Sequence, residues 1–179
     1  MESLTTKNIP SVTKYHYKHN DFLKHIKMIV EWSEFSPGGF RPFQPDMIVS
    51  INRGGLVPGV YLSHALDKPH YPIHYQTRDD TPGYHDKSSH DFFLRPPIYN
   101  ILDKNKNILL VDDINDTGNT FSYIMNSWSK RMNLSLDDLK EQIKTSSLIE
   151  RAGSKWVVDY SPLILDTNDW VVFPWESKL

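Results

Sequence analysis

Residues 111–120 of the chain read VDDINDTGNT, and they continue an aliphatic run that starts at residue 108. Such a run closing on two aspartates predicts an interior parallel strand over residues 107–113 that is buried on both faces. A helix is predicted to begin near Thr117, because apolar side chains follow at helical spacing, at Phe121, Ile124, Met125, Trp128 and Met132. The order is strand, turn and helix, so we expect chemistry at the carboxyl end of this strand.

The turn itself has the features of a phosphate-binding site. Unpaired backbone N–H groups and the positive end of the helix dipole converge at a helix N-terminus. Gly118 allows the positive φ of an anion nest, and the hydroxyls of Thr117 and Thr120 add two donors. The segment therefore predicts a phosphate site next to Asp112 and Asp113.

Two carboxylates beside a phosphate would repel it unless they bind something else. Ribose hydroxyls or a Mg²⁺ ion are the candidates, and a phosphorylated sugar with a metal satisfies every group. The plain structural alternative is that Asp112 and Asp113 only end a strand and Thr117 only caps a helix. A receiver domain is excluded because too few residues follow Asp113 for a domain of about 100 residues. A P-loop ATPase is excluded because no GxxxxGK[ST] loop precedes the strand.

Outward from this segment, strands alternate with helices. An amphipathic helix is predicted to begin at Asn20, with Phe22, Ile26, Ile29 and Val30 on one face. The remaining expected elements are strands at 47–51, 72–76, 146–150, 155–160 and 169–176, and helices at 60–66 and 136–144, the last capped by Ser135. This alternation predicts an α/β fold with a mainly parallel twisted sheet flanked by helices.

Composition excludes several classes of protein. The 179 residues carry a formal net charge of −2, which gives no general attraction to nucleic acid. The absence of cysteine excludes disulfide scaffolds, thiol nucleophiles and thiolate zinc sites, and it fits a cytoplasmic location. No apolar run is long enough to span a membrane, and residues 1–10 do not form a secretory signal. We expect no nucleic-acid or membrane partner.

Three motifs together resemble the type I phosphoribosyltransferases. VDDINDTGNT is similar to their signature of an aliphatic strand, an acidic pair and a D-T-G-x-T loop. NRGGLVPG, at residues 52–59, resembles their pyrophosphate loop, and DWVVFPWE, at 169–176, resembles the C-terminal purine-binding segment of the xanthine-guanine and hypoxanthine enzymes. The resemblance implies transfer of a phosphoribosyl group from 5-phosphoribosyl-1-pyrophosphate (PRPP) to a 6-oxopurine, with Mg²⁺ as cofactor.

The resemblance also implies roles for the PRPP-binding residues. Asp112 and Asp113 would hold the ribose hydroxyls, Asp113 would also face Mg²⁺, and Asp116 would accept a proton from the purine. The loop residues that would hold the 5-phosphate are Asp116, Thr117, Gly118, Asn119 and Thr120. Pyrophosphate would be received by Arg53, Gly54 and Gly55, after a cis peptide bond between Asn52 and Arg53.

For the base, the resemblance makes Trp170 the stacking platform, with the Val171 backbone and Glu176 reading ring edges. Relatives carry a lysine that donates to the purine 6-oxo group, and the matching residue here is Arg151. This departure leaves the identity of the base open, and Lys155 is a second candidate donor.

The expected organisation is one domain over residues 1–179. Its core would span about 20–150, and a small hood would combine about 151–179 with part of the N-terminus. Residues 78–97 are expected to form a functional loop, in which HDKSSHD most simply stays solvated. Relatives imply a homodimer or homotetramer. Two alternatives remain: a PRPP-sensing regulator without catalysis, and a phosphoribosyltransferase for another base.

Overall fold

A parallel sheet forms the centre of the protein in the computed structural model, which describes residues 13–35, 43–75 and 106–176. Within these residues the sheet has five strands in the order β3-β2-β4-β5-β6. The strands are β2 (Met47–Asn52), β3 (His70–His74), β4 (Ile108–Asn115), β5 (Ile143–Arg151) and β6 (Leu163–Leu165). All four pairings are parallel, so the carboxyl ends of the strands meet at one edge, and the expected α/β fold is confirmed.

Strand β4 lies at the middle of this sheet because its first four side chains are aliphatic. Residues 108–111 have no exposed surface, and each buried side chain of this size contributes about 1.5–3 kcal/mol. The strand runs past its expected end at Asp113 to Asn115. Pairing of Ile114 with Ile149 and of Asn115 with Glu150 accounts for this extension, which brings the acidic pair inside the sheet edge.

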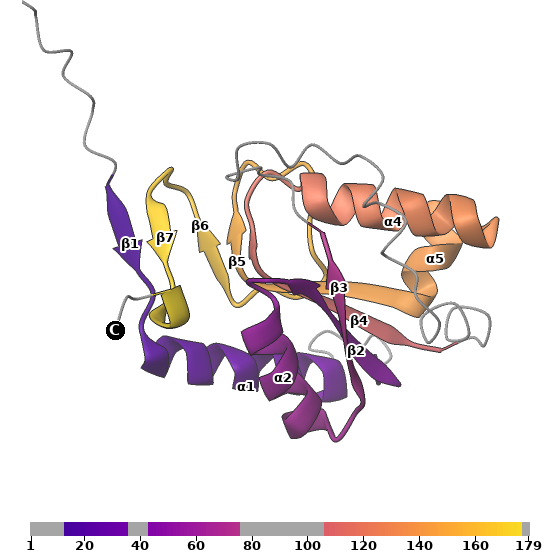
Figure 1. Ribbon diagram of the computed structural model, residues 1–179, viewed down its shortest axis with the longest axis horizontal. Coiled ribbons are helices and arrows are strands. Elements are labelled where there is room, and N and C mark those ends of the chain that lie inside the picture. Colours follow the sequence, from indigo (N-terminus) through magenta and orange to yellow (C-terminus); the bar gives the residue numbers. More distant parts are fainter. Residues whose placement is uncertain (1–12, 36–42, 76–105, 177–179) are drawn as a thin grey trace, which may run out of the picture.

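Helices cover the two faces of the sheet, with α1 (His19–Phe35) and α2 (Leu56–Leu66) on one face and α4 (Asn119–Met132) and α5 (Leu136–Gln142) on the other (Figure 1). Successive β2 side chains point to opposite cores: Ile48 packs with α1 and α2, and Val49 packs with α4 and α5. The predicted apolar faces are present in both long helices, although Val30 and Met132 are only partly buried.

The short helix α5 is capped as its sequence predicts. Ser135 Oγ accepts the Asp138 backbone N–H at 3.1 Å and donates to Asp138 Oδ2 at 2.6 Å. The helix ends at Gln142 rather than at residue 144, because Ile143 already belongs to β5 and pairs with Ile108.

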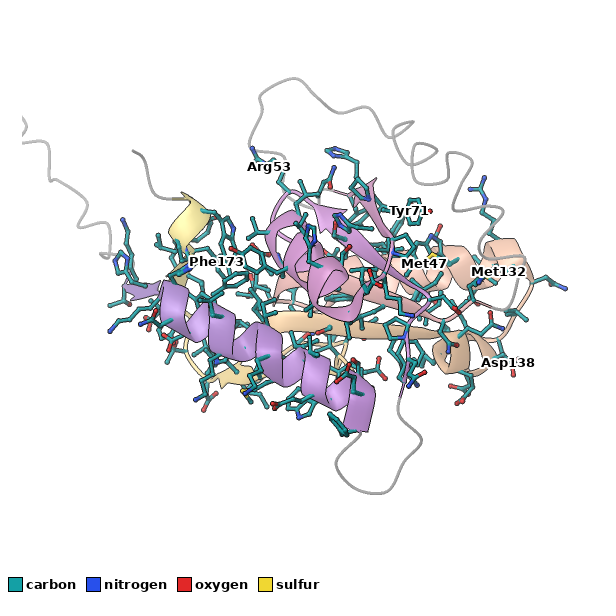
Figure 2. The ribbon with its side chains drawn as sticks, turned by 90° about the horizontal axis from the view of Figure 1, so that it is seen from below. Met47, Arg53, Tyr71, Met132, Asp138 and Phe173 are labelled. Carbon is teal, nitrogen blue, oxygen red and sulfur yellow. The ribbon has the colours of Figure 1, made fainter. Side chains whose placement is uncertain are left out.

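A second, two-stranded sheet joins the two ends of the described chain. Strand β1 (Lys14–His16) pairs in parallel with β7 (Trp170–Val172), and a short 3₁₀-helix, η2 (Pro174–Glu176), follows. This pair brings together the terminal segments from which a hood is expected. Figure 2 shows Phe173 where α1 begins, at the opposite end of the molecule from Met132 and Asp138.

The expected strand at 155–160 is wrong. Only Tyr160 forms a bridge, to Ser146, and the rest of the segment is irregular. Its backbone bonds go to other partners: the Lys155 N–H donates to the Thr117 carbonyl, and the Val158 N–H donates to Glu150 Oε1. Val158 is buried in the core and Trp156 packs against it, whereas Val157 is exposed, and β6 supplies the edge strand.

Residues 78–97, including HDKSSHD, lie outside the described residues. Among the helices that the structure does describe, none combines the length and the apolar character that a membrane crossing requires.

Candidate active site

A cavity of about 680 Å³ opens at the carboxyl ends of the central strands. The NRGG turn, the acidic pair, the turn before α4 and the C-terminal segment all contribute to its wall, although they lie far apart in the sequence. The predicted site residues that line it are Arg53, Gly54, Asp112, Asp113, Asp116, Thr117, Gly118, Asn119, Thr120, Arg151, Trp170, Val171 and Glu176.

The turn before α4 has the geometry of an anion site. Gly118, the N-cap residue of α4, has φ 80°, in the left-handed region, and makes no side-chain cap bond, while the Asn119 N–H lies 3.4 Å from Thr117 Oγ1. A Cβ atom at Gly118 would lie 2.4 Å from the Trp156 backbone N and 2.8 Å from Ser154 Oγ, so the following loop packs directly on the glycine. Free helix N–H groups next to Thr117 and Thr120 can bind a phosphate.

The acidic pair lies beside this turn, with Asp113 buried and Asp112 partly buried. Asp112 Oδ1 accepts the Asp113 N–H at 3.0 Å, and Asp113 Oδ1 accepts the Ile114 N–H at 2.8 Å. Burial, followed by the charge of Glu176, raises the pKa of Asp113 to about 6. Burial, followed by the charge of Asp113, raises the pKa of Asp112 above its usual range. A cation or sugar hydroxyls bound here would offset the cost of these charges.

The NRGG turn carries an arginine and a glycine to the cavity. The peptide bond between Asn52 and Arg53 is cis, as the resemblance implies. Figure 2 shows Arg53 at the outer end of β2, opposite to Met47 at its start. Gly54 lines the cavity and lies against the carboxylate of Asp113.

Gly55 has a different position from the one expected for a pyrophosphate contact. Its backbone N–H donates to the Ile51 carbonyl at 3.0 Å, so this amide is already used within the turn. A Cβ atom at Gly55 would lie 2.5 Å from the Val111 carbonyl oxygen. Glycine is required here because β4 passes so close, and the geometry does not support the expected anion contact.

The C-terminal segment forms the other wall. Trp170 is 50% exposed, and pairing of Val171 with Tyr15 holds the segment to β1. Glu176 Oε2 accepts the Phe173 N–H at 3.1 Å, which fixes its carboxylate at the cavity. The exposed indole face of Trp170 can stack on a planar ligand.

Arg151 is bound to protein groups in this structure. Its Nε donates to Asp116 Oδ1 at 3.3 Å, and its terminal nitrogens donate to the carbonyls of Thr167 and Asp169. Lys155, the second candidate donor, is exposed and contributes its backbone N–H to Thr117.

Sequence reasoning missed several lining residues, namely Tyr75, Asn115, Phe173, Trp175 and the side chain of Asn52. Two of them carry buried polar atoms without a hydrogen-bond partner in the described chain, Asn52 Oδ1 and Trp175 Nε1. Both lie within the motifs NRGGLVPG and DWVVFPWE, but the resemblance gives neither side chain a role, and an indole is equally typical of a core. Buried polar groups are normally paired, so these two atoms are candidates for ligand contacts.

Comparison with known proteins identifies the family and the fold. A family model described as phosphoribosyl transferase domain matches residues 14–179. A purine phosphoribosyltransferase from Pyrococcus horikoshii is 26% identical, with a TM-score of 0.62 over 93% of this chain and 95% of that one. No curated protein sequence matches the chain.

Two further solved structures share the fold at lower identity. The xanthine-guanine-hypoxanthine phosphoribosyltransferase of Helicobacter pylori is 22% identical, with a TM-score of 0.61 over 91% of this chain and 93% of that one. A hypoxanthine-guanine phosphoribosyltransferase of Bacillus anthracis is 15% identical, with a TM-score of 0.56 over 83% and 79%. With a family match that spans residues 14–179, the chain belongs to the phosphoribosyl transferase domain family and is an enzyme of the glycosyltransferase class.

Proposed function

We propose that this enzyme transfers the phosphoribosyl group of PRPP to a 6-oxopurine, giving a nucleoside monophosphate and pyrophosphate, as in purine salvage. The observation that carries the proposal is one cavity that is lined by the start of α4, by Asp112 and Asp113 and by the half-exposed indole of Trp170. A phosphate, a sugar and a planar base are the three parts of the product, and each has a matching wall.

PRPP would occupy the half of the cavity near α4. The 5-phosphate would accept hydrogen bonds from the N–H groups of residues 117–120 and from the Thr117 and Thr120 hydroxyls. Asp112 and Asp113 would accept hydrogen bonds from the ribose hydroxyls. Arg53 and the Gly54 amide would receive the pyrophosphate, for which a forked guanidinium is well suited.

Mg²⁺ is proposed as the cofactor, with Asp113 facing it. The described residues contain no group of three His, Asp or Glu side chains that could hold a metal on its own. Mg²⁺ typically binds one or two carboxylates and completes its shell with substrate oxygens and water, which fits the acidic pair. When bound, it supplies positive charge to the departing pyrophosphate.

In the reaction, the bond between the ribose C1 and the pyrophosphate oxygen breaks, and a bond from C1 to a ring nitrogen of the base forms. The nitrogen loses a proton, and the pyrophosphate leaves with the bonding electron pair. Asp116 would accept a proton from the base, since it lines the same cavity as Trp170 and contacts the base-side residue Arg151. General-base assistance contributes about 10²- to 10⁴-fold to the rate.

The base would stack on Trp170, which contributes about 1–3 kcal/mol. The Val171 backbone and Glu176 would contact its polar edges, and Arg151 is the remaining base-side residue. We also propose that residues 1–179 act as one domain, with a core at about 20–150 and a hood at about 151–179. A cytoplasmic homodimer or homotetramer without nucleic-acid or membrane partners completes the proposal.

A base panel tests the substrate. Purified protein, Mg²⁺ and PRPP are mixed separately with hypoxanthine, xanthine, guanine, adenine and orotate, and released pyrophosphate is measured. We expect turnover with at least one 6-oxopurine and its loss when EDTA removes the metal. Inactivity toward every purine would overturn the substrate assignment. PRPP binding without any turnover would favour a regulator.

The Asp116→Asn variant tests the proton acceptor. Its kcat is expected to fall about 10²-fold or more, because the amide cannot accept the proton, while PRPP affinity stays within about twofold. Equal losses in kcat and in PRPP affinity would contradict a general-base role.

A further inference from the structure

The guanidinium of Arg151 lies between two separate walls of the cavity. Arg151 is the last residue of β5, and its side chain is only 12% exposed. One partner, Asp116, belongs to the turn that precedes α4. The other two, the carbonyls of Thr167 and Asp169, come directly before β7. One side chain therefore connects the sugar-phosphate wall to the base wall.

The residues on either side make this connection specific. Asp169 precedes Trp170, the proposed stacking platform. A hydrogen bond to the Asp169 carbonyl therefore holds the backbone from which the Trp170 side chain extends. Asp116 is 38% exposed and carries the proposed proton acceptor, so a bond to its Oδ1 limits how the carboxylate turns. Because Arg151 itself is anchored in β5 by pairing with Leu165, it can hold both segments at once.

An arginine can do this and a lysine cannot. Its planar fork presents five N–H donors in fixed directions, of which the structure uses one on Nε and at least one on each terminal nitrogen. A lysine has one nitrogen at the end of a flexible chain, and this nitrogen cannot reach all three acceptor oxygens at once. The contacts therefore depend on the guanidinium shape and not only on its charge.

We propose that Arg151 is a positioning residue that sets the Asp116 carboxylate and the Trp170 segment at the distance a base requires. This inference rests on the proposed function and deepens it: base recognition depends on a guanidinium that is bound to protein groups. Residues 167–169 and the Asp116 side chain then move together. Loss of the guanidinium disturbs the base wall and the Asp116 carboxylate, while the backbone N–H groups of residues 117–120 stay in place.

The test compares Arg151→Lys and Arg151→Ala in the full chain, with Arg131→Lys as the matched control on the exposed end of α4. For Arg151→Lys we expect the KM for the base to rise about tenfold and kcat to fall, because charge-assisted hydrogen bonds are lost. The KM for PRPP should stay within about twofold, and the control should match wild type. Circular dichroism checks that each variant is folded.

Chemical rescue separates shape from charge. Added guanidinium chloride, at concentrations below those that unfold the protein, should restore part of the Arg151→Ala activity, whereas ammonium chloride at equal ionic strength should not. Equal rescue by both salts would overturn the proposal, as would an unchanged base KM in Arg151→Lys. If Arg151→Ala does not fold, the Arg151→Lys kinetics still decide.

Binding keeps this inference separate from the proposed function. If wild type turns over no base, the proposed function fails, and calorimetry with inosine monophosphate then tests the positioning role alone. An affinity loss of about tenfold in Arg151→Lys would support it. Equal affinities, or no binding by wild type, would overturn it.

Discussion

Gly54 lies directly against the carboxylate of Asp113. A Cβ atom at Gly54 would lie 2.2 Å from Asp113 Oδ2 and 2.3 Å from its Cγ, distances that no real Cβ occupies. The Asp113 carboxylate is held in turn by the Ile114 N–H. The NRGG turn and the acidic pair are therefore packed against each other, with no space for a side chain at Gly54.

Replacing Gly54 with alanine should displace the Asp113 carboxylate or the turn. We expect kcat/KM for PRPP to fall about 10²-fold, the loss that a misplacement of about 1 Å can cause in an active site. Gly153→Ala is the control, because a Cβ there meets nothing within 4 Å. Steady-state kinetics check both variants, and a Gly54→Ala enzyme as active as Gly153→Ala would contradict the proposed role of this contact.

Gly118→Ala should weaken both the fold and the phosphate site. Its φ of 80° is strained for any residue with a Cβ, at a cost of about 1–2 kcal/mol, and the added atom would lie 2.4 Å from the Trp156 N. Urea unfolding should show a decrease of at least that size in the free energy of unfolding. Calorimetry with ribose 5-phosphate should show weaker binding, and unchanged affinity would argue against a phosphate site at this turn.

The sequence predicts the strands and helices around VDDINDTGNT because the apolar side chains of these elements are buried, and their spacing along the chain shows which face is buried. Phe121, Ile124 and Trp128 are buried at the helical spacing that indicated α4. Residues 155–160 have an equally apolar pattern, but their backbone N–H groups donate to Thr117, Thr145 and Glu150, and no local pattern reveals such distant partners. The expected strand was therefore wrong.

Long-range pairing also limits what the sequence reveals about the site. Strand β1 has three residues and exists because it pairs with β7 near the other end of the chain. The motif resemblance named Arg151, Asp116 and Trp170 separately, but it did not indicate that a guanidinium connects their segments. The sequence likewise does not reveal that Trp175 Nε1 has no hydrogen-bond partner in the described chain, since tryptophans of a core and of a cavity have the same spacing along the sequence.

Trp175→Phe tests that unpaired N–H group. The phenyl ring keeps the stacking on Phe173, whose ring centre lies 4.8 Å away, but removes the only donor of the side chain. If the N–H binds a ligand acceptor, inosine monophosphate affinity should fall about tenfold, with little change in stability. Trp32→Phe, at a ring that contacts Tyr160, is the control. An unchanged affinity would place the indole in the core alone.

Low pH should destabilise the hood through protonation of His25. This histidine is buried on α1, its Nδ1 lies 2.7 Å from Tyr17 Oη, and the Tyr17 ring packs edge-on against Phe173. Burial lowers the pKa of His25 below its usual value of 6.5, an effect that the nearby Asp21 opposes and Lys24 reinforces.

The sign of the pH effect follows from proton uptake. Between the lowered pKa of folded His25 and 6.5, the unfolded chain binds more protons than the folded chain. The stability that neutral His25 contributes is therefore complete above pH 6.5 and is lost as the pH falls. Urea unfolding at pH 7 and pH 5 should therefore show a smaller drop for His25→Gln than for wild type. His64→Gln, at an exposed position on α2, should keep the wild-type drop. If all three proteins lose stability equally, protonation of His25 is not what destabilises the fold at low pH.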